Sequence, residues 1–70
     1  MYLAALRTRA GLSQVKAAEL LHVSQSAVAM WENGVMMPRK DKIPLIAEAY
    51  QTTVENVVNA LEKDRKEDSA

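Results

Sequence analysis

Apolar side chains recur every three or four residues along this sequence, in five separate segments. Spacings of i, i+3, i+4 and i+7 place side chains on one face of an α-helix, and the strict alternation typical of a half-buried strand is not found. The segments are separated by glycine, proline, serine and threonine, residues that commonly end or begin helices. The pattern therefore predicts an all-α chain of five short helices.

The first two predicted helices are separated by Gly11, which permits the left-handed backbone that ends a helix near Ala10. Ser13 is placed to cap the second helix by accepting a hydrogen bond from an amide of its first turn. The apolar spacing makes this helix about two turns long. Its apolar face consists of Ala17, Ala18 and Leu21.

The third predicted helix spans residues 25–33, with Ser24 as its cap and Asn33-Gly34 as its stop. Val28 and Trp31 occupy its buried face. The outer face carries Gln25, Ser26, Ala29 and Met30.

The last two predicted helices follow a connector that Pro38 holds in an extended conformation. Pro44 fits the first turn of the fourth helix, where its missing amide proton is not needed. Thr52 or Thr53 caps the fifth helix, and Thr52 with Glu55 would make a capping box. The apolar faces comprise Ile43, Ile46, Ala47 and Tyr50 in the fourth helix and Val54, Val57, Val58 and Leu61 in the fifth.

The segment after the fifth apolar face is strongly charged and lacks apolar periodicity. We expect residues 1–61 to form the domain and residues 62–70 to form a solvated, fraying helical extension. Glu62 and Lys66 stand at the i, i+4 spacing that supports such a helix.

Composition excludes most classes of function. The chain of 70 residues carries 49% apolar residues, no cysteine and one histidine, His22. Without a nucleophile–base pair or a set of metal ligands, we expect no enzyme activity, no cofactor and no metal site. No apolar run reaches the roughly 18 residues of a membrane span and no secretory signal is present, so we expect a soluble, cytoplasmic protein.

Charge is balanced overall but unevenly distributed. Nine Lys and Arg residues offset nine Asp and Glu residues, which argues against a protein that coats a polyanion through bulk charge. Residues 1–50 carry six basic and four acidic side chains, whereas residues 51–70 carry three basic and five acidic ones. A mildly basic body therefore bears an acidic end.

Two short helices joined by a tight turn, the second opening on uncharged polar residues, describe a helix-turn-helix unit. The surrounding motif consists of Leu6-Arg7, Gly11-Leu12-Ser13-Gln14, Ala17-Ala18, Val23-Ser24, Val28, Trp31-Glu32, Gly34 to Pro38 and Ile46-Ala47. From about Leu3 to Leu61 these positions resemble the Cro/repressor-type family of bacterial and phage regulators. The resemblance implies a five-helix, lambda-repressor-like domain that places residues 25–33 in the major groove of double-stranded DNA.

The resemblance also implies which side chains contact bases. Gln25 can pair bidentately with adenine, and Ser26 can bond to several bases. Ala29 and Met30 lack such donors and suit contact with the thymine methyl group, so we expect an A·T-containing half-site. The expected function is a sequence-specific transcriptional regulator, a repressor, that occupies an operator.

Phosphate contacts follow from the same resemblance. Gln14 lies at the amino end of its helix, where an anion is favoured. On the other side of the groove, Asn33 and the pair Arg39 and Lys40 are expected to hold phosphates, which sets register without reading sequence. The third helix is uncharged outside Glu32, which predicts weak nonspecific binding and a shallow salt dependence.

Arg7 interrupts an otherwise apolar helix face, and a lone buried charge there would cost several kcal/mol. Glu32 occupies the family position for its partner. A bidentate bridge between them would join the first helix to the third. His22 stands where the family usually has Gly, a turn position that needs a positive φ, which His tolerates better than most residues.

Two further interactions are expected. The family usually binds DNA as a two-fold dimer, with half-sites about 34 Å apart, and Leu45 and Val58 are candidate dimer contacts.

The alternative function is a protein-interaction module, such as an antitoxin or antirepressor, that binds its partner through the second helix and Val35, Met36 and Met37. Methionine adapts readily to partner surfaces, and the neutral net charge favours this alternative.

Overall fold

Every regular element within residues 1–69 is a helix. A computed structural model of the protein describes the backbone of residues 1–69 and the side chains of residues 1–65. The five α-helices are α1 (Tyr2–Arg9), α2 (Gln14–Leu21), α3 (Gln25–Glu32), α4 (Ile43–Ala49) and α5 (Val54–Ser69), and a 3-10 turn, η1 (Lys40–Lys42), leads into α4. No strand occurs within residues 1–69. The prediction of an all-α, five-helix chain is confirmed.

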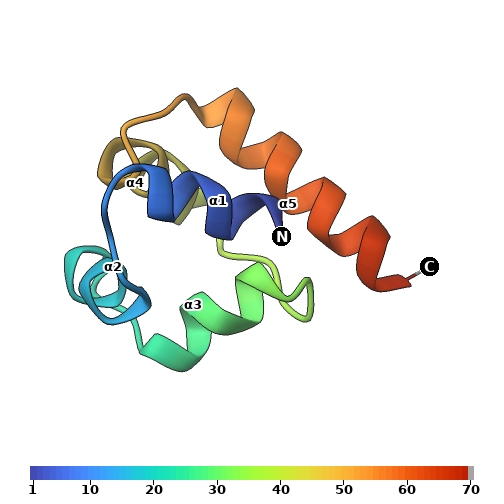
Figure 1. Cartoon of the computed structure of the whole chain (residues 1–70), viewed down its shortest axis with the longest axis horizontal. Coiled ribbons are helices and arrows are strands. Elements are labelled where there is room, and N and C mark those ends of the chain that lie inside the picture. The colour runs from blue at the N-terminus through green and yellow to red at the C-terminus, as the bar shows by residue number, and fades with distance from the viewer. Residues whose placement is uncertain (70) are drawn as a thin grey trace.

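The helices pack around a core to which each of them contributes. Helix α1 packs against α3 and α5, α2 against α3 and α4, and α4 against α5. In Figure 1, α3 runs along the lower edge of the molecule, and α5, the longest helix, lies at the upper right. The largest fully buried side chains are those of Leu3, Leu21, Val28, Ile46, Val57 and Leu61.

Helices α2 and α3 have the capping geometry that the sequence predicts. Ser13 Oγ accepts a hydrogen bond from the Lys16 amide at 3.0 Å, and Ser24 Oγ accepts one from the Ala27 amide at 3.1 Å. His22 ends α2 in the left-handed conformation, with φ of 57°. Both predicted caps and the predicted positive φ are confirmed, so local chemistry determines where α2 begins and ends and where α3 begins.

The start of α5 differs from the predicted capping box. Thr53 Oγ1 accepts from the Asn56 amide at 3.1 Å, so Thr53 is the cap. The third residue of the helix is then Asn56 and not Glu55, and the Asn56 side chain donates to Thr52 Oγ1 at 3.0 Å. Val54, expected on the apolar face, is 46% exposed. The predicted capping box of Thr52 and Glu55 is therefore wrong, because the helix begins one residue later than that box requires.

The charged segment after Leu61 does more than extend into solvent. The carboxylate of Asp64 is buried and accepts hydrogen bonds from the backbone amides of Tyr2, at 2.6 Å, and Leu3, at 3.0 Å. These amides belong to the first turn of α1, which has no other side-chain cap. The expectation of a solvated extension is therefore wrong at Asp64; Lys66, the expected partner of Glu62, lies outside the residues whose side chains are described.

The turn that ends α3 also rests against α5. Gly34 has a φ of 73°, and a Cβ added to it would lie 2.8 Å from the backbone oxygen of Asp64. Only glycine fits this approach without a shift of one backbone or the other. Asp64 thus lies where α5, the amino end of α1 and the end of α3 meet.

Candidate nucleic-acid interface

The two faces of α3 divide as the sequence pattern predicts. Val28 and Trp31 are buried, whereas Gln25 and Ser26 are exposed in the first turn. The other two residues of the predicted outer face, Ala29 and Met30, are half-buried. The amino end of α3 therefore presents its polar side chains outward, on a helix whose inner face is anchored in the core.

An ion pair beneath α3 joins it to α1. Arg7 Nε donates to Glu32 Oε2 at 2.6 Å and Nη2 donates to Oε1 at 3.4 Å, which is the bidentate arrangement expected from the sequence. The two side chains are 11% and 3% exposed. Arg7 Nη1 also donates to the carbonyl of Leu12 at 2.7 Å, so the pair holds the α1–α2 turn as well. Burial of both partners makes this an interaction whose disruption is costly.

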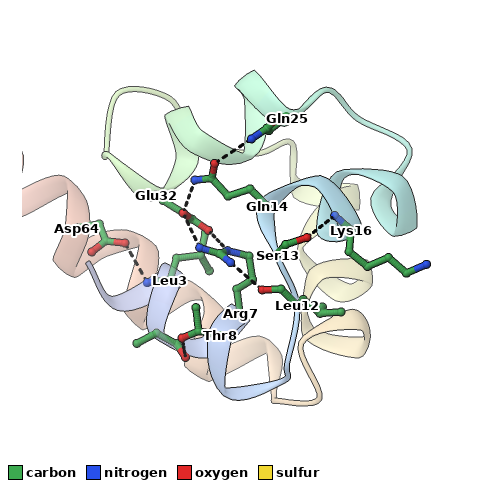
Figure 2. A network of polar contacts seen from close by, with 11 residues as sticks. Leu3, Arg7, Thr8, Leu12, Ser13, Gln14, Lys16, Gln25, Glu32 and Asp64 are labelled. Atoms are coloured by element: carbon green, nitrogen blue, oxygen red, sulfur yellow. Dashed lines mark hydrogen bonds and ion pairs between the residues drawn. The ribbon is translucent and has the colours of Figure 1, made fainter.

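Gln14 extends the ion pair to the surface. Figure 2 shows Glu32 between Arg7 and Gln14, with Gln25 beyond Gln14. Gln14 Nε2 donates to Glu32 Oε1 at 2.9 Å, and Gln14 Oε1 accepts from Gln25 Nε2 at 3.4 Å. An amide nitrogen carries two hydrogens, so the bond to Glu32 leaves one N–H of Gln14 for the phosphate contact expected from the sequence. The sequence did not reveal this link, because hydrogen bonding between side chains on two helices leaves no periodic signal.

The residues expected to hold phosphates on the other side of α3 are all exposed. Asn33 ends α3, and Arg39 and Lys40 lie at the start of η1. Arg39 Nε is 3.7 Å from Asp41 Oδ1, but both side chains are largely in solvent, where such a pair contributes little. Lys42 has a different role, since its Nζ donates to the carbonyl of Leu21 at 2.8 Å and closes the end of α2.

The residues expected to contact partners are apolar and at least partly exposed. Leu45 is 47% exposed on α4, and Val58 is half-buried on α5. Val35, Met36 and Met37 form a continuous exposed apolar segment after α3.

Tyr50 packs beside the ion pair with its hydroxyl unsatisfied. The side chain is buried, and no described residue forms a hydrogen bond with its hydroxyl group. Burial raises the pKa of Tyr50 to about 12 from its usual 10, and the nearby Glu32 carboxylate adds to the rise. The neutral phenol is therefore strongly preferred in the folded state.

This pKa predicts a loss of stability in alkaline solution. The unfolded chain ionises Tyr50 near pH 10 and the folded chain only near pH 12, so stability should fall by about 2–3 kcal/mol across that interval. Tyr50→Phe should abolish this part of the fall and be neutral or mildly stabilising at pH 7, because the unpaired hydroxyl is removed. Urea denaturation from pH 7 to 12 measures both effects, with Tyr2→Phe as the exposed control. Equal pH profiles for the wild type and Tyr50→Phe would contradict this explanation.

Within residues 1–69, no helix is both long and apolar enough to cross a membrane. The described side chains also include no group of three or more His, Asp or Glu residues arranged to hold a metal ion.

Comparison with known proteins agrees with this arrangement. A model of the helix-turn-helix family matches residues 3–57. The HTH-type transcriptional activator BcrR of Enterococcus faecalis is 32% identical over 57 residues, which cover 81% of this chain and 28% of that protein. No solved structure gives a significant match. The family match covers α1 through the start of α5 and includes α3, whose amino end is exposed. The chain therefore belongs to the helix-turn-helix family of the Cro/repressor type, whose domains bind double-stranded DNA.

Proposed function

We propose that this chain is a sequence-specific DNA-binding transcriptional regulator, without enzyme activity, that inserts the amino end of α3 into the major groove. The observation that carries the proposal is the exposure of Gln25 and Ser26 on a helix anchored by Val28 and Trp31. A rigid helix with outward amides and hydroxyls at its first turn is suited to reading base edges. The relative BcrR, described as a transcriptional activator, supports a regulatory role.

Base readout would depend chiefly on Gln25. Its hydrogen bond to Gln14 restricts the side chain before DNA arrives, which reduces the entropy lost on binding. Ser26 adds a hydroxyl that can face several bases. Ala29 and Met30 are half-buried, so they would contribute short apolar contacts to a thymine methyl group.

Selection of binding sites from random duplexes, followed by sequencing, tests this function. Enrichment of an inverted repeat is expected if two copies bind with two-fold symmetry through Leu45 and Val58. Half-sites would then be centred about 34 Å apart. A folded chain that enriches no sequence would contradict the proposal.

A substitution at Gln25 should change specificity rather than affinity alone. Gln25→Ala is expected to lose about 1–3 kcal/mol of discrimination at one base position, because the bidentate contact is removed. Competition binding with single-base variants of the selected duplex measures this loss. Arg39→Ala is the control, since loss of a phosphate contact should weaken all duplexes alike and reduce the salt slope by about 1. If Gln25→Ala weakened binding to all duplexes equally, Gln25 would hold a phosphate and not read a base.

The mode of regulation can be measured once a site is known. Occupation of an operator that overlaps a promoter would exclude polymerase sterically, so repression is the mode we propose. Because BcrR is described as an activator, a reporter with the operator placed upstream of the promoter serves as the comparison. Higher expression only from the upstream placement would make the chain an activator.

A second function, a protein-interaction module, is favoured by one observation. Val35 is 66% exposed, Met36 42% and Met37 39%, in a single segment. NMR titrations separate the two functions, because DNA should shift the side-chain amides of Gln25 and Asn33, whereas a protein bound at this segment should shift the methyl groups of Met36 and Met37.

A further inference from the structure

A groove of about 380 Å³ lies between α1 and α5, helices that pack side by side (Figure 1). It opens on a different face of α1 from the one that meets α3. Leu3 and Arg7 face the core and α3, whereas Leu6 and Arg9 line the groove. An occupant of this groove would leave the first turn of α3 free for DNA.

Both walls of the groove are regular helix faces. Helix α1 contributes four residues at i, i+3, i+4 and i+7, which are Tyr2, Ala5, Leu6 and Arg9. Helix α5 contributes four with the same spacing, which are Asn56, Asn59, Ala60 and Lys63. Each wall is therefore about two turns long, and the small side chains of Ala5 and Ala60 leave the space between them.

The two helices run in opposite directions along the groove. Lys63 Nζ lies 5.1 Å from the centre of the Tyr2 ring, and Asp64 binds the amides at the start of α1. Because Tyr2 is opposite Lys63, Arg9 lies towards Asn56 at the other end. A rise of 1.5 Å per residue over seven residues separates the two cationic positions by roughly 10 Å along the groove.

The charges that line the groove have one sign. Arg9 and Lys63 are basic, and no carboxylate is among the described residues that line it. Asn56 and Asn59 add amide groups that can donate or accept, and Leu6 with Ala60 supplies an apolar floor. The lining is therefore complementary to a ligand that is negative at both ends and apolar between them.

We infer that this groove binds an acidic amphipathic helix of a partner protein. Two carboxylates about two turns apart on that helix would meet Arg9 and Lys63, with apolar side chains over Ala5 and Ala60. The cations do not converge on one point, so a single small anion could engage only one of them. A third helix laid between two others is also a common packing and recognition arrangement.

A designed peptide tests this inference on the whole chain. The probe is an alanine-rich helix of about 15 residues, with two glutamates seven positions apart and leucines between them on the same face. The control peptide has the same composition with its glutamates on opposite faces. Saturable shifts of the Asn56 and Asn59 side-chain amides below about 1 mM probe are expected, and the control peptide should cause none.

Variants of the chain locate the binding site. The double substitution Arg9→Gln/Lys63→Gln should weaken probe binding about tenfold, and Ala5→Leu should block it by filling the groove. Arg39→Gln, an exposed cation outside the groove, should leave probe binding unchanged. Circular dichroism checks that each variant is folded.

The same experiments separate this inference from the proposed function. The double variant should bind the selected duplex as the wild type does, so loss of probe binding and loss of DNA binding are independent results. Three outcomes would overturn the inference: no shifts at saturating probe, equal shifts with the control peptide, or the same amide shifts produced by inorganic phosphate or by duplex DNA.

Discussion

Replacement of Glu32 by alanine is expected to lower the free energy of unfolding by about 3–5 kcal/mol. The substitution leaves the Arg7 guanidinium, only 11% exposed, without its carboxylate partner. It also removes the acceptor for the Gln14 amide. Urea denaturation followed by circular dichroism measures the loss.

An exposed ion pair provides the control for Glu32. Lys16 Nζ lies 3.7 Å from Glu19 Oε1 on α2, and both side chains are more than half exposed. Glu19→Ala should therefore cost less than about 1 kcal/mol. A loss below about 1 kcal/mol for Glu32→Ala as well would mean that the buried pair contributes no more than a surface one.

The link through Gln14 gives Glu32→Ala a second expected effect. Without Glu32, Gln14 keeps only its hydrogen bond with Gln25, so the side chain that we expect to read bases is held less firmly. Binding of the selected duplex at a temperature where the variant remains folded should weaken.

Gly34→Ala is expected to destabilise the fold by about 2–5 kcal/mol. Two costs add: a left-handed backbone costs a residue with a Cβ about 1–2 kcal/mol, and forced overpacking costs about 1–3 kcal/mol. The second arises because the new Cβ would lie 2.8 Å from the Asp64 oxygen and 3.1 Å from the Arg65 Cα, which are backbone atoms of α5. Urea denaturation again gives the magnitude.

Gly11→Ala is a matched control for Gly34. Its φ of 79° is close to the 73° of Gly34, but no atom lies within 4 Å of a Cβ added there. It should therefore show the backbone cost alone, about 1–2 kcal/mol. The difference between the losses of unfolding free energy in the two variants measures the cost of crowding the close contact between the α3 turn and α5. Equal losses would mean that α5 moves aside freely.

Much of the fold could be predicted because helix formation is local. The caps Ser13 and Ser24 act on amides three residues away, and the positive φ of His22 was expected because His22 stands where the family usually has Gly. The Arg7–Glu32 pair is not local, yet a charge on an apolar helix face must have a partner, and the family resemblance supplied its position.

The predictions that failed, and the features that were missed, depend on packing. Thr52 and Thr53 are both acceptable caps from the sequence, and in the structure it is the Thr53 hydroxyl that accepts from the Asn56 amide. Val54 has the periodicity of a core residue, but its side chain is 46% exposed. The buried role of Asp64 had no sequence signal, because its partners, Tyr2 and Leu3, are 62 and 61 residues away.

The sequence by itself determined the five helices, the caps of α2 and α3 and the polar first turn of α3, since these depend on residues a few positions apart. Only the tertiary structure decided that Gln14 joins the buried ion pair to Gln25, that Asp64 caps α1, and that Arg9 and Lys63 share a groove. The physical reason is that hydrogen bonds and charges act over a few ångströms in space, and the packing of helices sets which residues come that close.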